Sequence, residues 1–218
     1  MSGAPHKQPR AARAKRSLLR DDSGTTLVEF AIVMPIFLLL LFGLIDFGRM
    51  GFEYVRATKA VQLATRVAVT RPPACPGVAT VNARGTVPNG TVPPIFGTNC
   101  RAGATICAAP ATVTCAGSAS DTTAAEVWAS VSPLMPTGSS VANLRFSYAY
   151  TRELGFLGGP YVPMVTVQIT NLNFQFITPL DALAALAGSA NSGLPGSLPF
   201  PALSVTLPAE DLALGEAG

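Results

Sequence analysis

The chain has 218 residues, of which 49% are hydrophobic and only 12% are charged. A soluble domain usually carries about 25% charged residues, so the composition argues against an ordinary soluble protein. The net charge of +3 is too small to indicate nucleic-acid binding by itself. Six of the fifteen Lys and Arg precede residue 21, and five more lie between residues 49 and 71. This gradient suits a basic collar beside a membrane better than a nucleic-acid surface.

Residues 1–24 form a polar, basic leader without apolar periodicity. The next segment, Leu27 to Ile45, has 19 residues and is interrupted only by Glu29 and Pro35. As a helix it would span roughly 28 Å, close to the hydrocarbon thickness of a bilayer. A cleavable secretory signal is the alternative, but its apolar core has only about 7–15 residues and is followed by a small-x-small site, which is missing here. We therefore expect one transmembrane helix.

The basic residues on either side of this span predict its orientation. Six lie before it, whereas Arg49, Arg56 and Lys59 follow it closely. By the positive-inside rule the leader stays in the cytoplasm and everything after residue 46 lies outside. Asp46 and Arg49 are interpreted as anchors at the membrane interface.

The helix is expected to continue outside the membrane as far as residue 71. Small and apolar side chains recur there at alternating spacings of three and four, the pattern of a helix packed against another surface. The members of this seam are Phe47, Met50, Tyr54, Ala57, Val61, Ala64 and Ala68. The seam could serve a partner or cover the core of the exterior domain. Pro35 is expected to kink or locally unwind the helix, and Arg71-Pro72 to end it.

Residues 72–120 are rich in proline and glycine and hold all four cysteines. These are Cys75, Cys100, Cys107 and Cys115. An even number in an extracytoplasmic region favours two disulfides, with three possible pairings. A zinc site is the alternative, but the gaps of 25, 7 and 8 residues lack close pairs, and the only histidine is His6. We expect the disulfides to order a region that is too poor in apolar residues to fold alone.

Residues 121–218 predict a small α+β extracytoplasmic domain. Thr123 and Glu126 have capping-box spacing at the start of a short helix that ends at Ser132-Pro133. Residues 144–151 alternate as one strand, and the run from residue 163 continues as a second strand through a bulge near Thr170–Asn171. After the bulge its apolar face switches from Val165, Val167 and Ile169 to Leu172, Phe174 and Phe176. A short helix over 179–186 and a last strand over 203–207 follow. The chain is thus divided into a leader (1–24), a transmembrane and membrane-proximal helix (25–71), a cysteine-bearing loop region (72–120) and this domain (121–218). The predicted fold class is membrane-anchored α+β, in which a long N-terminal transmembrane helix continues into a small antiparallel β-rich domain.

The most specific pattern is GTTLVEFAIVMPIFLLLLFGLIDFGR, residues 24–49. A glycine follows the charged leader, and Glu29 stands five residues after it. This arrangement resembles the class III signal peptide of type IV pilin-like proteins, in which a prepilin peptidase cuts after the glycine and the helix is kept. The run VEFAIVMP, followed by LIDFGR, resembles the TadE family of the tight-adherence (Tad/Flp) pilus system. A Thr-Pro-Leu turn at 178–180 and a last strand closing near Glu210 agree with that resemblance.

The resemblance implies a pilus assembly protein, a minor pilin or pseudopilin, in the inner membrane of a bacterium. Its implied partners are the lipid bilayer, the prepilin peptidase, other Tad pilus subunits and the assembly platform, with no nucleic acid. Cleavage is expected between Gly24 and Thr25, which would make Glu29 the fifth residue of the mature chain. Because an acid inside an apolar helix is costly, Glu29 is expected to pair with the new amine, although it could instead snorkel to the interface.

Two other classes of function are the alternatives to a pilus assembly protein. An anchored enzyme is disfavoured because the outer part has no histidine, no Gly-x-Ser-x-Gly motif and few acids, so no catalytic residue, cofactor or metal is expected. An anchored extracytoplasmic binding module unrelated to pili is the second alternative. Cleavage separates it from the pilin interpretation, because a plain anchor keeps residues 1–24.

Overall fold

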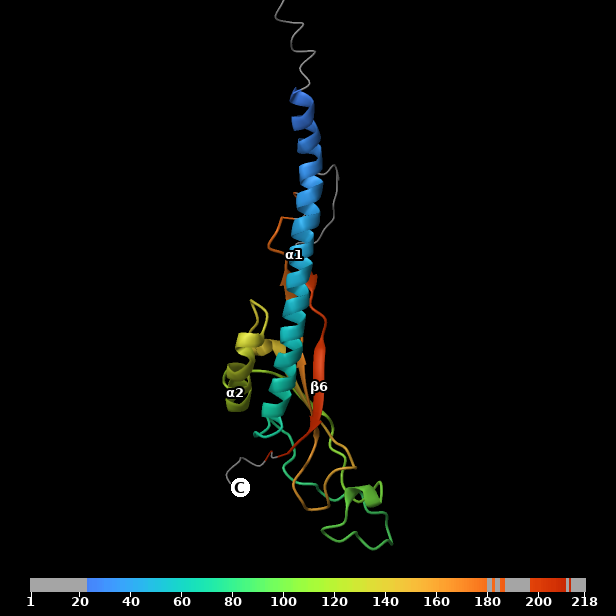
Figure 1. Ribbon diagram of the computed structural model, residues 1–218. Helices are drawn as coiled ribbons and strands as arrows, with labels where there is room; N and C mark the ends of the chain where they lie inside the picture. Colours follow the sequence, from blue (N-terminus) through green and yellow to red (C-terminus); the bar gives the residue numbers. More distant parts are fainter. Residues whose placement is uncertain (1–22, 180–181, 183–184, 187–196, 211, 213–218) are drawn as a thin grey trace, which may run out of the picture. The chain divides into compact units, whose positions relative to one another are not determined.

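The structure of the protein is a computed structural model that describes residues 23–179, 182, 185–186, 197–210 and 212. The chain divides into two compact units. The first holds the residues up to Phe47 and those from Phe176 to Gly196, and the second holds Gly48–Gln175 and Ser197–Gly218. One helix, α1 (Ser23–Ala68), contributes to both (Figure 1). Most of the leader lies outside the described residues.

The predicted fold class is confirmed, since a long apolar helix is followed by antiparallel sheets. In the second unit a four-stranded sheet has the order β1-β2-β3-β6, and every neighbouring pair is antiparallel. Its strands are β1 (Val113–Ala116), β2 (Leu144–Ala149), β3 (Met164–Ile169) and β6 (Leu203–Pro208). Strand β1 falls in the cysteine-bearing stretch, where the sequence predicts no strand. That stretch therefore supplies one edge of the sheet.

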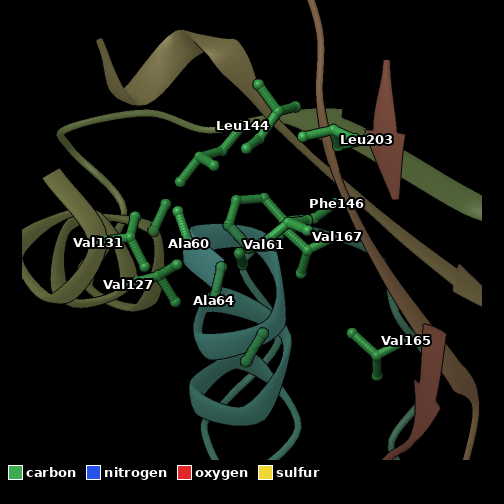
Figure 2. Packing of buried hydrophobic residues seen from close by; sticks show 14 of the residues in the cluster. Ala60, Val61, Ala64, Val127, Val131, Leu144, Phe146, Val165, Val167 and Leu203 are labelled. Carbon is green, nitrogen blue, oxygen red and sulfur yellow. The ribbon is translucent and has the colours of Figure 1, made fainter. Parts of the chain in front are cut away.

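The core of the second unit forms between α1, the sheet and the short helix α2 (Thr122–Val131). The seam of α1 is buried from Ala57 onward, whereas Tyr54 remains 43% exposed. Small side chains on these turns let the helix approach the other elements closely. Figure 2 shows the labelled members of this cluster, which are Ala60, Val61, Ala64, Val127, Val131, Leu144, Phe146, Val165, Val167 and Leu203. For these turns the seam covers the domain's own core, which is the simpler of the two interpretations.

The start of α2 differs from the predicted capping box. The N-cap is Asp121, whose carboxylate accepts a hydrogen bond from the Ala124 amide at 2.7 Å. Thr123 is buried inside the first turn instead. Glu126 accepts hydrogen bonds from the Arg71 guanidinium, with the closest contact at 2.8 Å, and these hold the pKa of Glu126 below its usual value. The prediction was wrong because two overlapping cap signals lie within three residues, and the earlier one, an aspartate, is the stronger cap.

The predicted bulge near Thr170–Asn171 is also wrong, because the strand ends there. Asn171 has a φ of 58°, in the left-handed region that asparagine tolerates better than most residues. The Asn143 side chain donates to the carbonyls of Thr170 and Asn171, both at 3.1 Å, and so holds the turn. The chain then enters a separate two-stranded sheet of β4 (Asn173–Gln175) and β5 (Ser197–Pro199). The short helix expected over 179–186 lies mostly outside the described residues.

The structure selects one of the three disulfide pairings. Cys75 pairs with Cys115 across 40 residues, and Cys100 pairs with Cys107 across 7 residues. The first bond ties the chain just after α1 to strand β1. Beside it, the Ala74 amide donates to the Tyr148 hydroxyl at 2.9 Å, and burial raises the pKa of that hydroxyl to about 12. The end of α1 is therefore fixed to the sheet by a covalent bond and a hydrogen bond.

Removing the longer disulfide is expected to destabilise the outer domain more than removing the shorter one. Closing a loop removes entropy from the unfolded chain, so Cys75→Ala/Cys115→Ala should cost about 4 kcal/mol and Cys100→Ala/Cys107→Ala about 2 kcal/mol. Trp128, the only tryptophan, lies partly buried against the core and can report unfolding by its fluorescence in a urea titration. An equal or reversed order of the two midpoints would contradict the expectation.

Candidate functional site

The N-terminal end of α1 carries the residues of the predicted processing site. Gly24, Thr25 and Glu29 all lie in the helix and are all exposed. A Cβ atom on Gly24 would meet no heavy atom within 4 Å, so packing against the described residues does not require a glycine at this position. Glu29 lies four positions after Thr25, which is about one helical turn and about 6 Å of rise. An amine created at Thr25 would therefore lie one turn from the Glu29 carboxylate.

The apolar segment behind this end is mostly exposed. Among the described residues α1 is the one helix that is long and apolar enough to cross a membrane. Leu27 is 71% exposed and Leu44 is 74% exposed, while Ile45 at the end of the span is 55% exposed. Such an apolar surface on a helix is compatible with lipid rather than water. The helix runs through Pro35 without an interruption, so the expected local unwinding is absent.

At the other end of the span, Asp46 holds a segment that is distant in sequence. Its side chain is buried, with only 2% of the residue exposed. The carboxylate oxygen Oδ2 accepts a hydrogen bond from the Thr178 amide at 3.1 Å and another from the Thr178 hydroxyl. Next to it, the rings of Phe47 and Phe176 meet edge to face, with centroids 5.9 Å apart. Both contacts lie within the first unit.

In the second unit, Arg49 makes a comparable set of contacts. Its Nη2 donates to the Gln175 carbonyl at 2.8 Å, and its Nε donates to Glu53 at 3.3 Å. Its guanidinium carbon lies 4.7 Å from the centre of the Phe174 ring, a cation–π distance. A planar cation with several donors can satisfy a carbonyl, a carboxylate and a ring at once.

Comparison with known proteins bears on this helix. Residues 24–66 match the family model of the TadE-like proteins. No curated protein and no solved structure matches the chain. The match begins at Gly24 and includes Glu29, Asp46 and Arg49, so the resemblance read from the sequence is confirmed over this range. A TadE-like segment suggests a function associated with the Tad pilus and its subunits.

The matched segment therefore contains Asp46 and Arg49, whose two long-range contacts were not predicted from the sequence. Asp46 and Arg49 were assigned to the interface, yet Asp46 accepts from Thr178, 132 residues later, and Arg49 donates to Gln175, 126 residues later. One signal for this pairing was present. The Asp-Phe-Gly-Arg run and the Thr-Pro-Leu turn both belong to the family resemblance, but nothing in a single sequence shows that they meet.

Replacing Asp46 with leucine is expected to release the Thr178 segment. Two donors would lose their acceptor, at a cost of about 2–3 kcal/mol. Hydrogen exchange of the Thr178 amide, followed by mass spectrometry in detergent micelles, should accelerate by roughly 30- to 150-fold. Asp46→Asn is the matched control, because its carbonyl oxygen can still accept, and it should show a smaller increase. An unchanged exchange rate of the Thr178 amide in the leucine variant would show that Asp46 does not hold this segment.

Proposed function

We propose that the protein is a pilus assembly protein of the Tad/Flp system, acting as a minor pilin or pseudopilin in the inner membrane of a bacterium. The observation that carries the proposal is the TadE-like match that begins at Gly24, at the head of an exposed apolar helix. A plain membrane anchor requires neither a glycine at that position nor an acid five residues later. Both are the features that processing and assembly of pilin-like proteins use.

The proposed course of maturation follows from the order of the segments. The basic leader stays in the cytoplasm, and the prepilin peptidase cuts between Gly24 and Thr25. The helix remains in the bilayer, and the disulfide-bonded domain lies outside. The mature subunit then pairs the Thr25 amine with a Glu29 carboxylate, either its own or that of a neighbouring pilus subunit.

The role proposed for the outer domain is structural rather than enzymatic. The region after the span contains no histidine, and its few acids are scattered over the chain. Among the residues described, no group of three His, Cys, Asp or Glu side chains is placed to hold a metal ion. The expected partners are therefore other pilus subunits and the assembly platform rather than a small-molecule substrate.

N-terminal sequencing of the protein extracted from membranes tests the proposal. A mature chain that starts at Thr25 is the expected result, together with co-purification of other Tad pilus components. A chain that retains residues 1–24 in cells that assemble pili would contradict the processing and would favour the alternative, an anchored binding module unrelated to pili.

A further inference from the structure

A small lobe extends from the second unit beyond the C-terminal end of α1, and its first segment, residues 81–107, is drawn in green in Figure 1. We define this tip lobe as residues 81–107 with residues 156–160. The disulfide between Cys100 and Cys107 and the fully buried Leu157 form its separate small core. Isolated β-bridges join the two segments at Val81–Pro160 and Asn99–Phe156. The lobe is therefore a built structure rather than an unsupported loop.

Five large apolar side chains of the tip lobe are exposed outside that core, and the three most exposed lie close together in the sequence. Val92 is 91% exposed, Ile95 is 77% exposed and Phe96 is 72% exposed, all within five residues. The Phe96 ring lies so close to Gly158 that a Cβ there would come within 2.4 Å of it. The ring is thus held in place while most of its surface remains open. Apolar side chains gathered on a built surface commonly mark an interaction site.

The charge of the tip lobe has a single sign. No acid occurs between Glu53 and Asp121, whereas Arg84 and Arg101 both lie in the lobe and are exposed. The guanidinium carbon of Arg84 lies 5.1 Å from the centre of the Phe96 ring. In the adjoining turn, Glu153 is paired with Arg152 at 3.3 Å, so its charge is offset. An apolar tip beside unopposed arginines matches a partner that is apolar inside and anionic at its surface.

Part of the tip backbone is hydrogen-bonded within the lobe. Pro93 and Pro94 have no amide hydrogen, and the Gly97 amide donates to the Leu157 carbonyl at 2.9 Å. The Thr98 amide and hydroxyl both donate to the Ile95 carbonyl, at 3.2 and 2.7 Å. Backbone groups that are satisfied internally cost little to place in lipid. The exposed apolar side chains and the unopposed arginine charge of the lobe are what favour a lipid surface.

We propose that the tip lobe is a docking surface for an anionic lipid bilayer. Val92, Ile95 and Phe96 enter the interface, and Arg84 and Arg101 contact the lipid phosphates. This inference is independent of the pilus role proposed above, since a plain anchored module could carry the same surface.

Flotation of the full-length protein with vesicles tests the proposal. The protein is held in nanodiscs of phosphatidylcholine and mixed with separate vesicles, either of phosphatidylcholine alone or with about one third phosphatidylglycerol to supply anionic charge. We expect flotation with the anionic vesicles only, weakened by salt. V92S/I95S/F96S should lower the partition coefficient at least roughly tenfold, and R84Q/R101Q should abolish the preference for anionic lipid.

Matched variants keep the test decisive. F52S/V55S/L63S removes three comparable apolar side chains that are exposed on α1, and it should float like the unchanged protein. Ile95→Trp should increase binding, because tryptophan favours the membrane interface. An intact Cys100–Cys107 bond in the tip variants, seen by non-reducing mass spectrometry, shows that the lobe still forms. Absence of flotation with anionic vesicles, or full binding by V92S/I95S/F96S, would overturn the proposal. Binding of a protein to the tip lobe without any binding to vesicles would overturn it too.

Discussion

A Gly24→Val protein should accumulate in the membrane with its leader attached, longer than the mature form by the 24 residues that precede Thr25. The peptidase that we propose must place the backbone before the scissile bond in its active site. A branched side chain blocks that approach and is also stiff about its first side-chain torsion. We expect processing to fall below detection in a gel or in intact-mass spectra.

Gly43→Val provides the matched control for this variant. Gly43 lies in the same helix, and a Cβ there would likewise meet nothing within 4 Å. The two substitutions therefore change helix propensity and apolar surface alike, and only one touches the proposed cleavage site. Gly43→Val should be processed normally. A mature N terminus at Thr25 in the Gly24→Val protein would exclude this cleavage site.

Regular patterns in the sequence predicted much of the fold. Val165, Val167 and Ile169 alternate because one face of β3 is buried, and all three are buried in the structure. The long apolar helix α1 was equally predictable, because the sequence holds an apolar run whose length is that of a candidate membrane span. Both features follow from the local periodicity of apolar residues along one segment, which can be read from a single sequence.

Long-range partners could not be predicted in the same way. Cys75 bonds Cys115 rather than a nearer cysteine because β1 pairs with β2 and brings Cys115 beside the chain that leaves α1. The sequence gives little sign of β1, which has only four residues and is only partly buried. The hydrogen bonds from Thr178 to Asp46 depend on a similar return of the chain. In each case the sequence shows that the side chain can form a disulfide or accept a hydrogen bond, but the tertiary structure determines its partner.

A Glu29→Ala protein should be inserted and processed but should fail to assemble. The substitution makes the span more hydrophobic, so membrane insertion should persist or improve. Gly24 is untouched, so cleavage should still expose an amine at Thr25. Without the carboxylate one turn away, that ammonium would enter a surrounding of apolar helices unpaired, at a cost of about 3–5 kcal/mol. Such a cost would weaken the association of each subunit with the pilus by roughly a hundredfold or more.

Comparison of variants at Glu29 separates charge pairing from mere tolerance of a polar side chain. Glu29→Asp keeps the carboxylate on a shorter side chain and should retain part of the assembly, whereas Glu29→Gln keeps the size but not the charge and should behave like alanine. The measurements are pilus yield and co-purification with other pilus components, with membrane level and N-terminal sequence as controls. In a Gly24→Val background no amine forms at Thr25, so Glu29→Ala should add no further defect. Normal pili from a stable, processed Glu29→Ala protein would mean that the acid only snorkels to the interface, and they would remove the strongest physical support for the pilin interpretation.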